Sequence, residues 1–115
     1  MTEPTIDPAT FTELEATAGA DFIAELIDTF LVEAPSLLDE LRRAYAARDA
    51  DAFRRAAHSL KSNANTFGAR ALGVMARELE LTGIAPVTEA GGKPLERLAQ
   101  EYARVAAELA GLRDA

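Results

Sequence analysis

One histidine, His58, is the residue of this 115-residue chain best suited to nucleophilic chemistry. Around it, apolar residues recur at spacings of four, three, four and three positions: Phe53, Ala57, Leu60, Ala64 and Phe67. This spacing is typical of one buried face of a helix. At about 100° per residue, His58 projects about 140° from the middle of that face, toward solvent. An imidazole that faces water on a rigid helix suits a nucleophile better than a core position.

A cation and small polar side chains share the exposed side of the same helix. Lys61, Asn65 and Ser62 lie at about 80°, 120° and 180° from the middle of the apolar face. Each of them could be an ordinary solvated surface residue. Beside His58, however, the Lys61 ammonium could offset the charge of phosphoryl oxygens, and the other two could contact a partner.

Charge is distributed unevenly along the chain. The net charge of −7 argues against a nucleic-acid partner. Residues 1–41 hold ten acidic and no basic residues, whereas residues 42–61 hold six basic residues against two acidic ones. The basic stretch contains Arg54 and Arg55 and ends at His58 and Lys61. It is either a solvated helix face or a local attraction for a phosphoryl group or an acidic partner.

The composition excludes several classes of site. Without cysteine there are no disulfides or thiolate metal sites, and a single histidine leaves only carboxylates to complete a metal site. We find no glycine-rich phosphate loop and no nucleophile–base pair, so we expect neither a nucleotide site nor an enzyme active site. No run of about 18 apolar residues predicts a membrane span. The acidic start lacks a signal core, and we therefore expect a cytoplasmic protein.

Helices are predicted over almost the whole chain, because β-branched residues are sparse and strand-like alternation is absent. A first helix is expected from an Asp7 N-cap with Pro8 in its first turn, and it stops near Gly19. A second tract covers residues 20–48, and Pro35 within it predicts a kink or a break.

Asp49 or Asp51 is expected to cap the helix that carries His58, and Gly68 to close that helix. Another helix is predicted over residues 70–82, followed by a loop over residues 84–92. The last helix is expected to begin near Pro94. Its apolar seam consists of Leu95, Leu98, Tyr102, Val105, Leu109 and Leu112.

These elements predict an all-α fold, an antiparallel up-down four-helix bundle with a short N-terminal capping helix. We expect a single domain over residues 1–115. Within it, residues 1–19 form the capping segment and residues 20–112 form the bundle.

The segment His58-Ser59-Leu60-Lys61, followed by Phe67-Gly68-Ala69, resembles the motif of histidine-containing phosphotransfer (HPt) domains of two-component phosphorelays. The motif, which begins at Ala57 and ends at Ala69, covers thirteen positions, while the helical layout, with Glu33-Ala34-Pro35 in the preceding tract, covers nearly the whole chain. The resemblance implies that His58 is the phosphoacceptor, Lys61 the cation one turn on and Gly68 the helix-ending glycine. Ser62 departs from the family pattern, which usually has glycine there, and this departure leaves partner choice open.

The resemblance also implies a function. Neutral His58 would accept a phosphoryl group from a receiver-domain aspartate and pass it to another receiver, with Ser62, Asn65, Arg54 and Arg55 as docking residues. The implied partners are receiver domains and a hybrid sensor histidine kinase, with no nucleic acid and no membrane. We expect a monomeric carrier without a cofactor or kinase activity of its own, and Mg²⁺ in the partner receiver. The alternative is a non-phosphorylated helical binding module that regulates a histidine kinase or response regulator.

Overall fold

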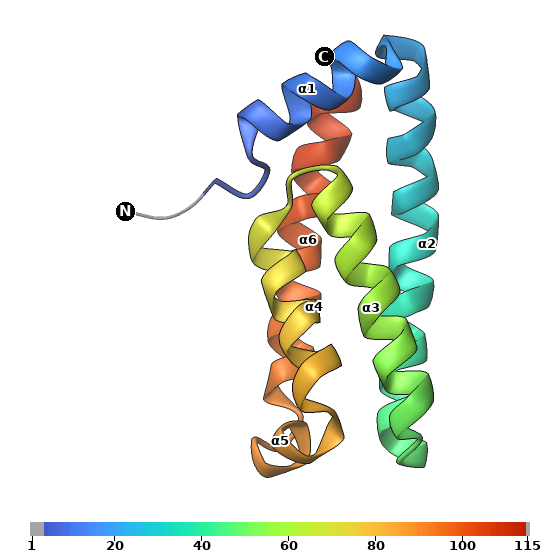
Figure 1. Cartoon of the computed structure of the whole chain (residues 1–115), viewed down its shortest axis with the longest axis vertical. Coiled ribbons are helices and arrows are strands. Elements are labelled where there is room, and N and C mark those ends of the chain that lie inside the picture. The colour runs from blue at the N-terminus through green and yellow to red at the C-terminus, as the bar shows by residue number, and fades with distance from the viewer. Residues whose placement is uncertain (1–3, 115) are drawn as a thin grey trace.

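The computed structural model describes residues 4–114, and this part of the chain contains six helices and no β-strand. Four long helices lie side by side, and two shorter ones lie at the ends of this arrangement (Figure 1). The helices are α1 (Pro8–Ala18), α2 (Ala20–Ala47), α3 (Ala50–Thr66), α4 (Arg70–Thr82), α5 (Ile84–Glu89) and α6 (Lys93–Asp114).

The chain reverses direction between successive long helices, so that α2, α3, α4 and α6 form the predicted antiparallel up-down bundle (Figure 1). Helix α1 lies across one end of it, as expected for a capping helix. The backbone N–H of Asp7, just before α1, donates to the carbonyl of Gly68 in the α3–α4 connection at 2.8 Å. This bond attaches the capping segment to the turn that follows the histidine helix.

The predicted helix caps are confirmed in detail. The carboxylate of Asp7 accepts from the Thr10 backbone N–H at 3.0 Å, and Pro8 is the first residue of α1. Asp49, and not Asp51, caps α3 by accepting from the Ala52 N–H at 3.1 Å. A side-chain oxygen at this position satisfies an N–H group that has no partner within the helix.

Two elements refine or correct the sequence-based prediction. Helix α2 continues through Pro35, so of the two expected outcomes, a kink or a break, the break is excluded. Proline removes only one hydrogen bond from the helix, while Ala34 and Leu38 on either side remain buried in the bundle. The expected loop over residues 84–92 is wrong in its first part, where α5 forms. Pro86 lies in the first turn of α5, where no intrahelical N–H is needed, and Val87 is fully buried.

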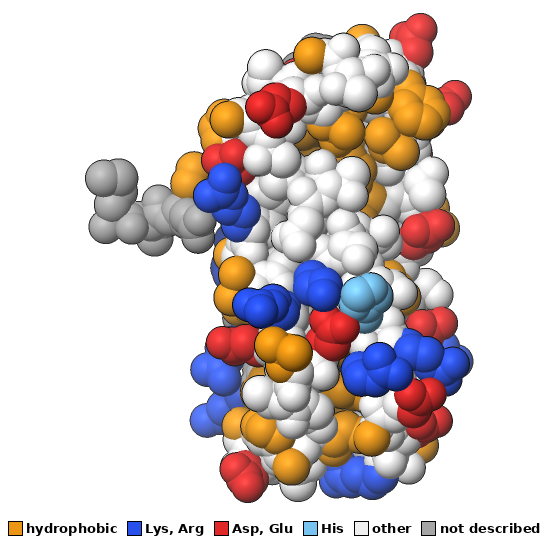
Figure 2. All heavy atoms as spheres, in the orientation of Figure 1, with side chains coloured by type: hydrophobic (Ala, Val, Ile, Leu, Met, Phe, Trp, Pro, Cys, Tyr) orange, Lys and Arg blue, Asp and Glu red, His pale blue; other side chains and the backbone are white. Residues whose placement is uncertain are grey.

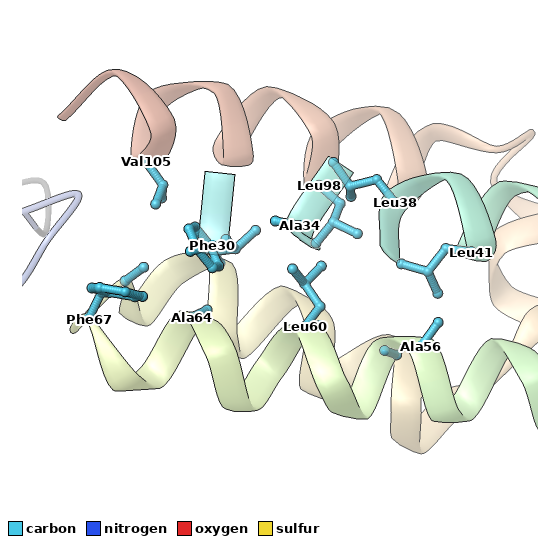
Figure 3. Close-up of a cluster of buried hydrophobic side chains, with 14 of the residues drawn as sticks. Phe30, Ala34, Leu38, Leu41, Ala56, Leu60, Ala64, Phe67, Leu98 and Val105 are labelled. Atoms are coloured by element: carbon cyan, nitrogen blue, oxygen red, sulfur yellow. The ribbon is translucent and has the colours of Figure 1, made fainter. Parts of the chain in front are cut away.

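The core lies between the four long helices, and Figure 3 shows the part in which apolar side chains of α2, α3 and α6 point toward one another. Helix α4 contributes the buried Leu72 and Ala76. Leu60 is fully buried there, which confirms the helical phase inferred around His58. The ring centroids of Phe30 and Phe67 are 5.3 Å apart, so Phe67 belongs to the core. Leu112 does not continue the seam of the last helix, because 37% of it is exposed. Within residues 4–114, no helix is long and apolar enough to span a membrane.

Candidate functional site

His58 lies in the middle of α3 with its side chain in solvent, as the helical spacing predicted. Its side chain is 57% exposed, whereas Ala57 and Leu60 on the neighbouring positions are fully buried. The space-filling view shows the imidazole on the open surface, beside both cationic and acidic side chains (Figure 2). A reacting group can therefore approach the ring from outside without a change in the core.

A carboxylate from α4, that of Glu80, joins His58 to Lys61. One oxygen, Oε2, lies 2.7 Å from His58 Nδ1, and the other, Oε1, accepts from Lys61 Nζ at 2.8 Å. The side chains of Glu80 and Lys61 are only 15% and 23% exposed, so this bridge between α3 and α4 is largely shielded from solvent. The prediction from sequence placed Lys61 beside His58 and missed Glu80.

The protonation state of Glu80 follows from these contacts. The hydrogen bond from Lys61 and, next, the one from His58 hold the pKa of the Glu80 carboxyl below its ordinary value. Glu80 is therefore ionised at neutral pH, and an ionised carboxylate can only accept hydrogen bonds. His58 Nδ1 must then carry the proton of the 2.7 Å contact. Among residues 4–114 no group forms a hydrogen bond with Nε2, which is the free ring nitrogen.

The register between α3 and α4 explains why Glu80 meets His58. The two helices are antiparallel, so residues at equal distances before and after the turn lie opposite each other. Asn65 and Gly73, four positions before and after Ala69, are in contact, and a Cβ at Gly73 would collide with the Asn65 side-chain oxygen. His58 and Glu80 lie eleven positions before and after the same residue. Counting outward from the predicted turn is thus the signal that could have found Glu80.

Ser62 and Asn65 lie beyond His58 on α3, toward the end covered by α1. Both are exposed, and the Asn65 side chain rests over Gly73 of α4. Between the histidine and α1, the face in Figure 2 has no charged side chain at its centre. A small, uncharged surface thus adjoins the imidazole on this side, and it is open to contact by another protein.

Arg54 and Arg55 lie one turn before His58 on α3, exposed but not free. Asp51 pairs with both, at 2.9 Å from Arg54 Nη2 and 3.3 Å from Arg55 Nε. The hydrogen bond from Arg54 and the charge of Arg55 hold the pKa of Asp51 below its ordinary value. The two arginines therefore present less positive charge than the residue count indicates.

An open groove runs between α2 and α3 beside the histidine. One part, of about 320 Å³, is lined by Glu33, Ser36, Leu37, Ser59 and Asn63. A larger part, of about 570 Å³, continues from Ser59 along small alanine side chains between Arg43 and Arg55. Because Ser59 is the neighbour of His58, a protein seated in this groove would lie next to the imidazole. In the described part of the chain, no group of three or more His, Cys, Asp or Glu residues could hold a metal ion.

Comparison with known proteins agrees with this arrangement. The family model of the Hpt domain matches residues 25–115, which include all of α3 and α4. The chain belongs to the Hpt domain family. The Hpt chain is also similar to the crystal structure of histidine-containing phosphotransfer protein B (HptB) from Pseudomonas aeruginosa PAO1. The TM-score is 0.88 and the sequence identity 26%, over 98% of this Hpt chain and 97% of that one. No curated protein sequence matches the Hpt chain significantly.

Proposed function

We propose that His58 is a phosphoacceptor that takes a phosphoryl group from a receiver-domain aspartate and passes it to a second receiver in a phosphorelay. Membership of the Hpt family and the similarity to HptB support histidine phosphotransfer. The observation that carries the proposal is the exposed imidazole at the motif histidine, with Nε2 free among the described residues. In this proposal the chain is a monomeric carrier in the cytoplasm.

The transfer needs positioning and charge stabilisation more than covalent machinery in the carrier. As the P–Nε2 bond forms, the P–O bond to the aspartate breaks and its carboxylate leaves; the return step reverses these changes. The Lys61 ammonium, one turn from His58, can offset charge on the phosphoryl oxygens. It is engaged with Glu80 at 2.8 Å, so this effect acts at a distance unless Lys61 turns toward the phosphoryl group. Any Mg²⁺ belongs to the receiver.

Docking of the receiver involves the surfaces on either side of His58. The groove between α2 and α3 reaches Ser59, and the uncharged surface at Ser62 and Asn65 lies along α3. The family resemblance implies that a receiver has an acidic active face. Arg54 and Arg55 can attract that face when they pair with its carboxylates in place of Asp51.

The direct test is transfer of labelled phosphate from phosphorylated receiver domains to this protein and to His58→Gln. We expect acid-labile, base-stable label on the wild-type protein and none on the variant, with an unchanged helical circular dichroism spectrum. Label that persists on His58→Gln would refute the proposal, as would failure of every cognate receiver to transfer. Receiver binding without any label would instead support the alternative of a non-phosphorylated binding module.

A further inference from the structure

The positive charges near His58 differ in whether a carboxylate of this chain already neutralises them. The lysine and the two arginines that the sequence identified on α3 are each paired with a carboxylate. Arg77, on the neighbouring helix α4, is exposed, and its side chain forms no ion pair with any residue among positions 4–114. Residues 52–77 contain no acidic residue. The only acid three or four positions from Arg77 is Glu80, and both of its oxygens are already engaged in the bridge to α3. The Arg77 guanidinium, with five N–H donors, is therefore available to a carboxylate of another protein.

The register between α3 and α4 brings Arg77 close to the imidazole. Arg77 and Lys61 each lie eight positions from Ala69, so the two residues lie opposite each other on the antiparallel pair of helices. Lys61 is three residues beyond His58, a step of about 4.5 Å along the helix axis, and the axes of packed helices are about 8–10 Å apart. A protein large enough to cover the imidazole therefore also covers Arg77.

Two exposed apolar side chains flank Arg77 on α4. Val74 lies three positions before it and Leu81 four positions after it, which places all three residues on one face of the helix. Val74 is 59% exposed and Leu81 is 67% exposed. Figure 2 shows apolar and cationic side chains together on the α4 side of the imidazole. An arginine surrounded by apolar groups is typical of the residues that contribute most to the affinity of a protein interface.

We propose that Val74, Arg77 and Leu81 form a docking surface for the receiver, in which Arg77 pairs with a carboxylate of the receiver's acidic face and the two apolar side chains pack beside that pair. The inference rests on the proposed function, and it adds α4 to a docking surface that otherwise consists of residues of α2 and α3. Transfer requires the receiver's phosphorylated aspartate to lie over the exposed imidazole of His58. The rim of its acidic face then reaches α4.

Arg77 is better suited to this contact than the arginines of α3. Arg54 and Arg55 must first give up their contacts with Asp51, and that exchange offsets part of the gain from a new partner. Arg77 gives up no ion pair with the described residues, and its planar guanidinium can bind a carboxylate through two parallel hydrogen bonds. Packing of the two apolar side chains excludes water from this pair, which strengthens it. We therefore expect Arg77→Ala to weaken receiver binding more than Arg54→Ala does.

Calorimetric titration with unphosphorylated receiver domains, the same ones used in the transfer test, measures the contribution of Arg77. We expect Arg77→Ala to raise the Kd by about fivefold to thirtyfold, the range for loss of an arginine at the centre of an interface. Arg77→Lys keeps the charge but not the planar guanidinium, so its Kd should lie between those of the wild type and Arg77→Ala. Arg97→Ala is the matched control, because it removes an exposed arginine from α6, changes the net charge equally and should leave the Kd unchanged.

The apolar part of the surface has its own matched pair of variants. Val74→Ser removes an exposed valine beside Arg77, and Val32→Ser removes one from α2 that lines neither part of the groove beside the histidine. We expect Val74→Ser to raise the Kd by about fourfold or more, which corresponds to the loss of one buried CH₂ group, and Val32→Ser to leave it unchanged. Both valines are exposed, so both variants should keep the helical circular dichroism spectrum.

Transfer rates distinguish docking from a direct part in the chemistry. At saturating receiver, Arg77→Ala should transfer the phosphoryl group at the wild-type rate, because the bound complex contains the same imidazole. Slower transfer at saturation with an unchanged Kd would place Arg77 at the phosphoryl group and would overturn the docking role.

These measurements also separate the inference from the proposed function. A wild-type protein that takes no label, together with weaker receiver binding by Arg77→Ala, would overturn the proposed function and support the docking surface. Label on His58 together with an Arg77→Ala variant that binds receivers no more weakly than Arg97→Ala would overturn the inference alone. Binding by no receiver would overturn both.

Discussion

At the scale of single residues, the sequence motif identifies one half of the site. His58 and Lys61 lie on one helix, so their spacing alone predicts that they are neighbours. Glu80 is twenty-two positions beyond His58, and nothing in the segment Glu78-Leu79-Glu80-Leu81 separates it from Glu78. Only the register of two antiparallel helices brings one of these carboxylates to the imidazole. Neighbours on a single helix are therefore predictable from spacing alone, whereas a partner from another helix can be found only once the turn that sets the register between the two helices is placed.

The lowered pKa of Glu80 predicts a pH-dependent contribution to stability. Its folded-state pKa is below the unfolded value, so its contribution is present above about pH 4.3, the ordinary glutamate pKa, and is lost as pH falls through the folded-state value. We expect the difference in unfolding free energy between the wild-type protein and Glu80→Gln to be larger at pH 5 than at pH 2.5. Urea unfolding at both values measures it.

The comparison isolates the carboxyl group because the two proteins differ only at residue 80. The other carboxyls with lowered pKa values, Asp7 and Asp51, are present in both proteins and cancel in the difference. An equal difference at pH 5 and pH 2.5 would show that the ionised form of Glu80 does not stabilise the fold.

At the scale of helices, the turn between α3 and α4 sets the register on which the site depends. Gly68 has φ of 80°, in the left-handed region, and the Asp7 N–H donates to its carbonyl. The cap residues and this turn were predictable because glycine and short polar side chains act locally. The sequence left open whether Pro35 kinks or breaks α2, and it did not predict α5, because burial of Leu38 and Val87 in the core outweighs the local preference of proline.

We predict that Gly68→Ala destabilises the fold by at least about 1–2 kcal/mol, the cost of a left-handed conformation for a residue with a Cβ. The added Cβ would lie 2.9 Å from Thr10 Cβ and 3.2 Å from the Asp7 carbonyl oxygen, so α1 must also shift. Urea unfolding measures the loss. Gly111→Ala in α6 is the control, because that Cβ meets no atom within 4 Å and alanine favours a helix by up to about 1 kcal/mol. A Gly68→Ala protein as stable as the wild type would contradict this account of the turn.

At the scale of the whole molecule, positive charge is concentrated near His58 in a chain of net charge −7. The number of basic residues between positions 42 and 61 predicted this concentration, yet nearby carboxylates compensate much of the positive charge. Arg43 pairs with Asp39 at 3.2 Å, and Asp51 alone engages both Arg54 and Arg55. The pairs follow from spacings of three and four positions on a helix. The attraction of this surface for an acidic partner is therefore limited by its own carboxylates.

This limit predicts that Asp51→Asn increases the rate of association with a receiver whose active face is acidic. The variant leaves the charges of Arg54 and Arg55 uncompensated near His58. One exposed charge contact is worth about 1 kcal/mol in water, so we expect the association rate constant to rise by up to about fivefold at low salt. The increase should vanish at about 1 M salt, where charges more than about 3 Å apart are screened. Loss of an acid from the first turn of α3 should cost only about 0.3–1 kcal/mol of stability, so the protein stays folded.

Stopped-flow association across a salt series measures the effect, with Glu13→Gln on α1 as a control that changes net charge equally at the far end of the bundle. Equal acceleration by both variants would show that net charge, and not the arginines beside His58, governs the encounter.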